Sequence, residues 1–104
     1  MIFNKDNFKI EIESFSGLVL VDFFAEWCGP CQLMAPMIEE MIKENKDNNI
    51  KIGKLNIDEN QDVAAQYGVM SIPTFIVFKN GKVVDKKIGY GGKEEIEQLI
   101  VKNK

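Results

Sequence analysis

Two cysteines separated by a glycine and a proline are the residues of this sequence best suited to chemistry. Cys28 and Cys31 are the only cysteines among 104 residues, and the chain contains no histidine. A helix places residues three apart on one face, so sulfurs at this spacing come close enough to bond. Pro30 favours the first turn of a helix, because its missing N–H costs nothing there. The motif therefore predicts a reversible dithiol at the start of a helix, with Gly29 and Pro30 modulating its geometry.

The two sulfurs are predicted to be chemically unequal, because they lie at different depths in the expected helix. Cys28 comes first, where unpaired backbone N–H groups and the positive end of the helix dipole favour a thiolate. Nucleophilic attack requires the thiolate, so Cys28 is the candidate nucleophile and is expected to be exposed. Cys31 lies one turn deeper and is the candidate resolving thiol.

Three other uses of the cysteine pair fit this sequence less well. A structural disulfide between positions so close together constrains the unfolded chain little, and a reducing cytoplasm would break it. Zinc needs about four ligands, and a chain with two cysteines and no histidine leaves the others to carboxylates or to a second chain. Two cysteines that only fill a core do not need a glycine and a proline between them. We therefore expect redox chemistry and no bound metal.

Short strands and helices alternate around the motif. Residues 18–25 form a nearly continuous apolar run, which is typical of a strand covered on both faces. From residue 30 to about 46, apolar side chains recur at the spacing of an amphipathic helix. The other predicted elements are a strand at 2–3, a helix at about 6–13, a strand at 50–57, a helix capped by Asp58 and ended by Gly68, a hairpin of strands 74–79 and 82–88 turning at Asn80-Gly81, and a helix at 93–102. This order predicts an α/β domain with helices on both faces of a mixed sheet.

Length and charge limit the possible partners. We expect residues 1–104 to form one domain. The chain has 13 Lys, no Arg and 16 acidic residues, for a formal charge of -3, so it lacks the clustered cations that bind nucleic acid. No stretch approaches the roughly 20 apolar residues of a membrane helix, and the first residues lack the apolar segment of a signal peptide. We expect a cytoplasmic protein that binds neither nucleic acid nor membrane.

Residues 25–31, Ala-Glu-Trp-Cys-Gly-Pro-Cys, carry the active-site signature of a known family. Further matches along the chain are Val21-Asp22-Phe23, Pro36, Lys54-Leu55-Asn56-Ile57-Asp58, Ile72-Pro73-Thr74, Lys79-Asn80-Gly81 and Gly89. On these residues the chain resembles the thioredoxin family. The resemblance implies the thioredoxin fold, a three-layer α/β/α sandwich with a central five-stranded mixed sheet flanked by four helices. It also implies a monomeric thiol–disulfide oxidoreductase that binds no cofactor, reduces disulfides in other proteins and receives electrons from a thioredoxin reductase.

An aspartate and a lysine are the expected acid–base partners of the dithiol. Asp22 is an ionisable residue in an apolar strand, where desolvation keeps a carboxyl protonated, unless it lies at a solvated strand edge. The resemblance makes Asp22 the proton acceptor for Cys31. Lys54 shares the alternating face of Ile50 and Ile52 in its predicted strand, and it is either an ordinary surface lysine or, as the resemblance implies, a residue that modulates the ionisation of Asp22.

Four further residues are expected to bind the substrate. Trp27 is either a core aromatic or part of an exposed apolar collar, which we predict to include Ile72 and Gly89. An X-Pro bond is ordinarily trans, but the resemblance implies a cis bond before Pro73. The backbone of Ile72 is then expected to pair with an extended segment of the substrate.

Two residues depart from the family pattern. Phe24 stands where many relatives have tryptophan, and Gln32 stands where a lysine often follows the motif. An alternative function also remains open: the chain is a binding subunit that docks a partner through the apolar collar, whatever the oxidation state of Cys28 and Cys31.

Overall fold

A computed structural model describes all 104 residues, Met1–Lys104. Its elements are β1 (Ile2–Phe3), a short π-helix η1 (Lys9–Glu13), β2 (Leu18–Phe24), α1 (Gly29–Glu44), β3 (Ile50–Asn56), α2 (Gln61–Gln66), β4 (Thr74–Lys79), β5 (Lys82–Ile88) and α3 (Lys93–Val101). Their order and types are those predicted from the sequence, and most boundaries agree within two residues. None of the helices has the length and apolar character needed to cross a membrane.

The five strands form one mixed sheet in the order β1-β3-β2-β4-β5. The central strand β2 runs parallel to β3 and antiparallel to β4, and β4 and β5 form the predicted antiparallel hairpin. Asn80 and Gly81 both have positive φ at its turn, as a tight turn of this kind requires. The sheet and its helices confirm the predicted fold class.

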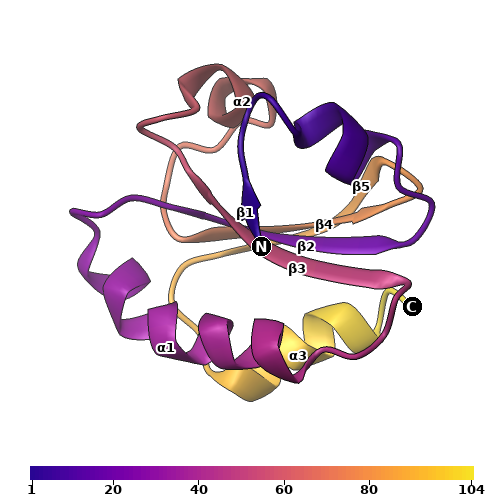
Figure 1. Ribbon diagram of the computed structural model, residues 1–104. Helices are drawn as coiled ribbons and strands as arrows, with labels where there is room; N and C mark the ends of the chain where they lie inside the picture. The colour runs from indigo at the N-terminus through magenta and orange to yellow at the C-terminus, as the bar shows by residue number, and fades with distance from the viewer.

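Helices cover both faces of the sheet, and each face has its own apolar core (Figure 1). Helices α1 and α3 lie on one side, while η1 and α2 lie on the other. The core under α1 and α3 contains Leu18, Leu20, Met34, Ile38, Met41, Ile52, Phe75, Val77, Ile96, Leu99 and Ile100. The core under η1 and α2 contains Phe3, Phe8, Ile12, Val19, Val21, Phe23, Leu55, Val63, Ile76 and Phe78. Strand β2 contributes to both cores, because successive side chains of a strand point to opposite faces.

One predicted boundary is wrong: Asp58 does not cap α2. The helix begins three residues later at Gln61, with Asn60 at the capping position. The backbone N–H of Asp58 donates to Oδ1 of Asn56 at 2.9 Å, so Asp58 belongs to a turn between β3 and the helix. Gly68 has φ +65 and ends the helix as predicted.

Candidate active site

The cysteine motif lies where β2 gives way to α1. Cys28 is the capping residue of α1, and its extended backbone turns the chain from the strand loop into the helix. The backbone N–H of Cys31 donates a hydrogen bond to Sγ of Cys28 at 3.2 Å. The two Cα atoms are 5.2 Å apart, and the sulfurs are joined in a disulfide. The pair is therefore a redox couple in its oxidised form at a helix N-terminus.

Both sulfur-bearing residues are buried, which corrects one expectation. Cys28 is 4% exposed and Cys31 is 3% exposed. They form a small cluster with Ala25, and Ile57 and Ile72 are among the partly buried side chains packed against it. The sequence gives the position of Cys28 along the helix but does not show that distant side chains pack beside its sulfur.

The two residues between the buried cysteines lie at the surface. Gly29 and Pro30 are both exposed, and no atom lies within 4 Å of the place where a Cβ on Gly29 would be. Gln32, just after the motif, donates from Nε2 to the carbonyl oxygens of Ala25 and Glu26 at 3.4 and 3.3 Å. Its side chain therefore ties the first turn of the helix to the loop before Cys28.

Asp22 is a buried carboxyl group with no hydrogen-bond partner. The residue is 2% exposed, and its Oδ1 has no partner at all. Burial raises the pKa of Asp22 to about 7, and the positive charge of Lys54 opposes that rise. The alternative of a solvated strand edge is excluded, because β2 is the central strand of the sheet. This carboxyl can therefore gain or lose a proton near neutral pH.

Lys54 lies opposite Asp22 in the register of β3 against β2. Its side chain is mostly covered, but its ammonium makes no ion pair with Asp22. Instead, Nζ lies 3.8 Å from Oε1 of Glu39 and 4.5 Å from the ring centroid of Phe24. The lysine is thus neither a freely solvated surface residue nor a direct partner of the buried carboxyl.

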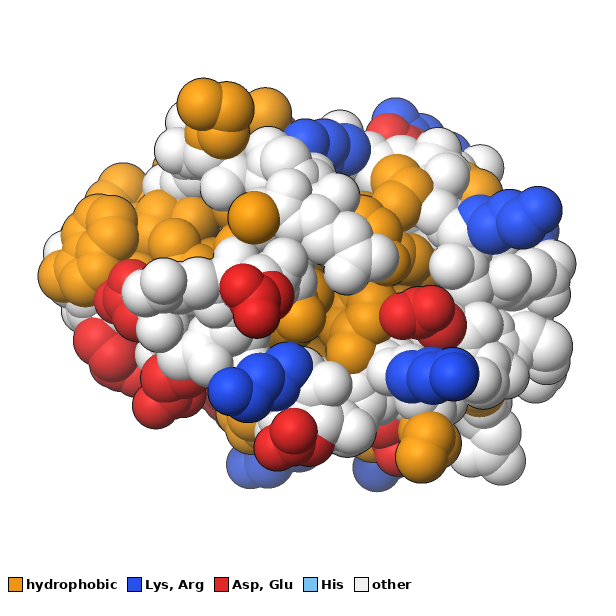
Figure 2. Space-filling view, turned by 90° about the horizontal axis from the view of Figure 1, so that it is seen from above, with side chains coloured by type: hydrophobic (Ala, Val, Ile, Leu, Met, Phe, Trp, Pro, Cys, Tyr) orange, Lys and Arg blue, Asp and Glu red, His pale blue; other side chains and the backbone are white.

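Trp27 is part of an exposed apolar surface and not of the core. The residue is 70% exposed, and its indole Nε1 donates to Oδ2 of Asp58 at 2.8 Å. Figure 2 shows hydrophobic side chains gathered at the end of the molecule where the β2–α1 loop lies, with acidic side chains beside them. Exposed hydrophobic residues on the loops that reach this end include Met70 and Tyr90.

Three other predicted binding residues lie together at the start of β4. Ile72 packs against the cysteine cluster, and the Ile72–Pro73 peptide bond is cis, as the resemblance implies. The backbone groups of Ile72 make no hydrogen bond within the chain. Gly89 has φ +96, a conformation that favours glycine, and its N–H donates to the carbonyl oxygen of Pro73 at 2.8 Å. Pro73 itself is buried, so it shapes the backbone of this segment and adds little to the exposed surface.

Two residues of this region had no role predicted in the site. Asp58 was expected only as a helix cap, although it falls within a run of family matches. Glu39 lies on α1 two turns after Cys31, and its contact with Lys54 joins residues that are distant in the sequence. Neither residue type nor local spacing indicates such a contact.

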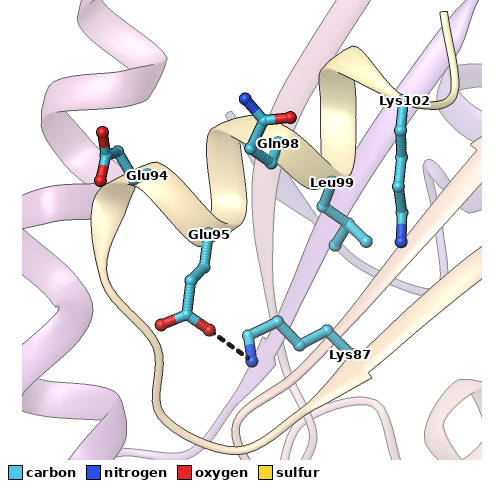
Figure 3. Close-up of a pocket in the computed structure, with 6 residues that line it drawn as sticks. All are labelled: Lys87, Glu94, Glu95, Gln98, Leu99 and Lys102. Carbon is cyan, nitrogen blue, oxygen red and sulfur yellow. Dashed lines mark ion pairs between the residues drawn. The ribbon is translucent and has the colours of Figure 1, made fainter.

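The hollow between β5 and α3 does not contain the dithiol. Its lining consists of Lys87, Glu94, Glu95, Gln98, Leu99 and Lys102. Figure 3 shows the side chain of Lys87 on β5 facing that of Glu95 on α3, with Nζ of Lys87 3.2 Å from Oε2 of Glu95. No three His, Cys, Asp or Glu side chains come together in a group that could hold a metal ion.

Comparisons with known proteins agree with this geometry. A sequence model of the family described as Thioredoxin matches residues 1–102. The chain is 48% identical over 91 residues to a thioredoxin of Bacillus subtilis, a match that covers 88% of this chain and 86% of the relative. It is 49% identical over 92 residues to a thioredoxin of Listeria monocytogenes, covering 88% of each. A thioredoxin of Chlamydia caviae is 46% identical over 99 residues, covering 95% of this chain and 93% of the relative.

The fold, the disulfide-forming pair and these relatives lead to one conclusion about activity. The chain is a thiol–disulfide oxidoreductase whose redox centre is the disulfide between Cys28 and Cys31. The matches extend over most of each relative and not over the motif alone. The chain belongs to the thioredoxin family.

Proposed function

We propose that this chain is a general protein-disulfide reductase that passes two electrons from a thioredoxin reductase to disulfides in other proteins. The observation that carries the proposal is the hydrogen bond from the Cys31 N–H to Sγ of Cys28 at the start of α1. A donor at this position stabilises negative charge on the sulfur, and so does the positive end of the helix dipole. Cys28 is therefore the nucleophile of the reduced protein.

The first step forms a mixed disulfide. The Cys28 thiolate attacks one sulfur of the substrate disulfide, the substrate S–S bond breaks, and the other substrate sulfur leaves as a thiolate and takes up a proton. A new S–S bond joins Cys28 to the substrate. The surface at Gly29 beside Cys28 is unobstructed, because no atom lies within 4 Å of the place where a Cβ on Gly29 would be.

The second step releases the substrate and needs a proton acceptor. The Cys31 thiol gives its proton to the Asp22 carboxylate, directly or through water, and then attacks Sγ of Cys28. The mixed disulfide breaks, the second substrate sulfur leaves as a thiolate, and the internal disulfide forms. Asp22 suits this role because burial brings its pKa to about 7, so both protonation states are populated near neutral pH. Lys54 modulates that ionisation through its positive charge.

The substrate docks as an extended segment beside the disulfide. The unpaired backbone groups of Ile72 are free to bond to such a segment. Trp27 and the turn at Gly89 supply the surrounding surface. In this mode the chain recognises the backbone of the substrate more than its side chains, so it can bind many different substrate proteins.

The need for a supply of electrons bears on where the protein works and which proteins it meets. A dithiol that donates electrons must be returned to its reduced form after each cycle, so we assign the chain to the cytoplasm. Its family resemblance supports a monomer. It meets a thioredoxin reductase and its substrates in turn. No bound cofactor takes part, because Cys28 and Cys31 carry the two electrons themselves.

Trapping experiments with single cysteine variants test the proposal. Cys31→Ser should attack substrates but not release them, so it accumulates covalent adducts that a thiol reductant dissolves. Cys28→Ser should accumulate few adducts, and neither variant should turn over. Adducts formed mainly by Cys28→Ser would contradict the assignment of the nucleophile. The variant with both Cys28→Ser and Cys31→Ser tests the alternative that the chain is a binding subunit. A function that survives the loss of both cysteines is not disulfide reduction.

A further inference from the structure

The Lys54 ammonium lies among groups from two elements besides its own strand. Strand β2 contributes the Asp22 carboxyl and the ring of Phe24, and α1 contributes the carboxylate of Glu39. The lysine side chain is only 13% exposed, whereas that of Glu39 is 61% exposed. Glu39 therefore meets the lysine from the solvent side, and Asp22 lies on the buried side.

The contacts of the ammonium favour the solvent side. Its nitrogen lies 3.8 Å from Oε1 of Glu39 and 4.5 Å from the ring centroid of Phe24, within the range of a cation–π contact. The Asp22 carboxyl, directly across the strand pair, receives no hydrogen bond and makes no ion pair. Two partners thus hold the positive charge away from a buried carboxyl that has none.

We propose that Glu39 is a positioning residue for the disulfide exchange: it holds the Lys54 ammonium against Phe24 and keeps it from pairing with Asp22, the buried carboxyl that takes the proton of Cys31. This inference rests on the proposed role of Asp22 in the release step. It gives Glu39, an exposed residue two helical turns from Cys31, a defined effect on the chemistry of the buried site.

Other charged groups around Asp22 do not offer the same control. Only Lys54, on β3, adds a charge effect to the pKa of Asp22. Strand β4 places uncharged Phe75 opposite Asp22. Helix α1 contributes apolar residues to the core on this face, and its Cys31 does not titrate in the disulfide form. Helix α3 contributes apolar residues to the core on this face, so Glu39 acts on Asp22 through Lys54.

The expected effect follows from where the ammonium goes when Glu39 loses its charge. In Glu39→Gln the attraction to the helix is removed, and Lys54 turns toward the Asp22 carboxyl opposite it in the strand pair. An opposite charge within about 4 to 6 Å lowers the pKa of a carboxyl by about 1 to 3. The midpoint of the Asp22 titration should therefore fall from about 7 by about 1 pH unit.

The experiment is a carbon NMR titration of the Asp22 carboxyl in the full chain, in the oxidised form so that neither cysteine titrates. Glu40→Gln is the matched control, because Glu40 is the next residue of the same helix but pairs with Lys93 at 2.6 Å. It removes the same charge without touching Lys54, so the Asp22 midpoint should stay at its parent value. The pH profile of substrate release should move with the NMR midpoint in Glu39→Gln.

A second pair of variants tests whether Glu39 acts through the lysine. In a Lys54→Gln background, the same Glu39→Gln substitution should move the Asp22 midpoint by less than half as much. The proposal is overturned if the midpoint in Glu39→Gln stays or rises, or if the full shift persists without Lys54. If Asp22→Asn releases substrate at the parent rate, the proton-acceptor role fails instead, and the titration still reports whether Glu39 positions Lys54.

Discussion

The two faces of β2 contain different kinds of core, although they belong to one strand. The residues toward η1 and α2 are all apolar, namely Val19, Val21 and Phe23. The residues that alternate with them are Leu18 and Leu20, which lie in the core under α1 and α3, followed by Asp22 and Phe24. Alternation along the strand thus separates a wholly apolar face from a face that also carries the carboxyl that we propose as the proton acceptor.

The purely apolar face gains stability from well-packed aromatic rings. Phe8, Tyr67 and Phe78 contact one another with ring centroids between 5.3 and 5.7 Å apart, mostly edge to face. Such pairs add about 0.5 to 1.5 kcal/mol beyond the burial of their surface. The opposite face places a carboxyl without a partner at 2% exposure, which lowers stability whenever the group is charged. The comparison indicates that the apolar face offsets a cost on the functional face.

The largest expected effect comes from emptying the apolar face. Phe78→Ala removes a fully buried ring and should lower the free energy of unfolding by about 3 to 5 kcal/mol. Denaturant unfolding measures this loss. The rate of disulfide exchange per folded molecule should stay at the parent value, because the ring lies across the sheet from the Asp22 side chain. A matched loss of exchange rate in the folded fraction would show that the two faces are not separable.

Replacing the Asp22 carboxyl should raise the free energy of unfolding, whereas Phe78→Ala lowers it. The pKa of Asp22 is about 7 in the folded chain, above its ordinary 3.8, so the folded state binds this proton more tightly than the unfolded state does. The contribution of Asp22 to stability is therefore greatest at low pH, falls as pH rises between these two values, and changes no further above the higher one. The cost at alkaline pH is at most about 4 kcal/mol, since each pKa unit corresponds to about 1.4 kcal/mol.

The Asp22→Asn variant has no carboxyl to ionise at this position, so comparing it with the parent measures the loss of stability caused by the Asp22 charge. Relative to the parent, the variant should gain stability as pH rises from about 4 to about 7, and the gain should then level off. Chemical denaturation of both proteins across this range measures the difference. A constant difference at all pH values would contradict the assignment of a raised pKa to this carboxyl.

The smallest expected effect on stability comes from the exposed hydrogen bond between Trp27 and Asp58. Asp58→Asn weakens the hydrogen bond from the Trp27 indole, which measures 2.8 Å to the carboxylate. Because both residues are exposed, the loss of stability should be about 0.5 to 1 kcal/mol. Trp27 is the only tryptophan, so its emission spectrum reports the change directly. An unchanged spectrum would show that the indole does not keep this contact in solution.

Much of the fold and the centre of the site could be predicted because they depend on local chemistry. The Cys28-to-Cys31 spacing, the apolar run of β2 and the Asn80-Gly81 turn each constrain a few neighbouring residues. The order of elements and the position of Asp22 in a covered strand follow from such patterns. The chain's resemblance to a family supplied the strand count and the cis bond.

The remaining features depend on contacts between distant segments. The burial of Cys28 needs Ile72, which comes more than forty residues later in the chain. Asp58 was predicted as a helix cap, yet its carboxylate accepts from Trp27, far away in sequence. The pairing of Lys54 with Glu39 across the β3–α1 interface has no local signal. Residue type shows what each side chain can do, but only packing decides which partner it meets.

The central claim is that Asp22 takes the proton of Cys31 when substrate is released. Rapid mixing of a preformed mixed disulfide, followed at a series of pH values, measures that single step without the attack that precedes it. In the parent, the release rate should rise through a midpoint near the Asp22 pKa of about 7. In Asp22→Asn, that midpoint should disappear and release should be slower by about a hundredfold or more. Release with the parent rate and the parent pH profile in the variant would contradict the account.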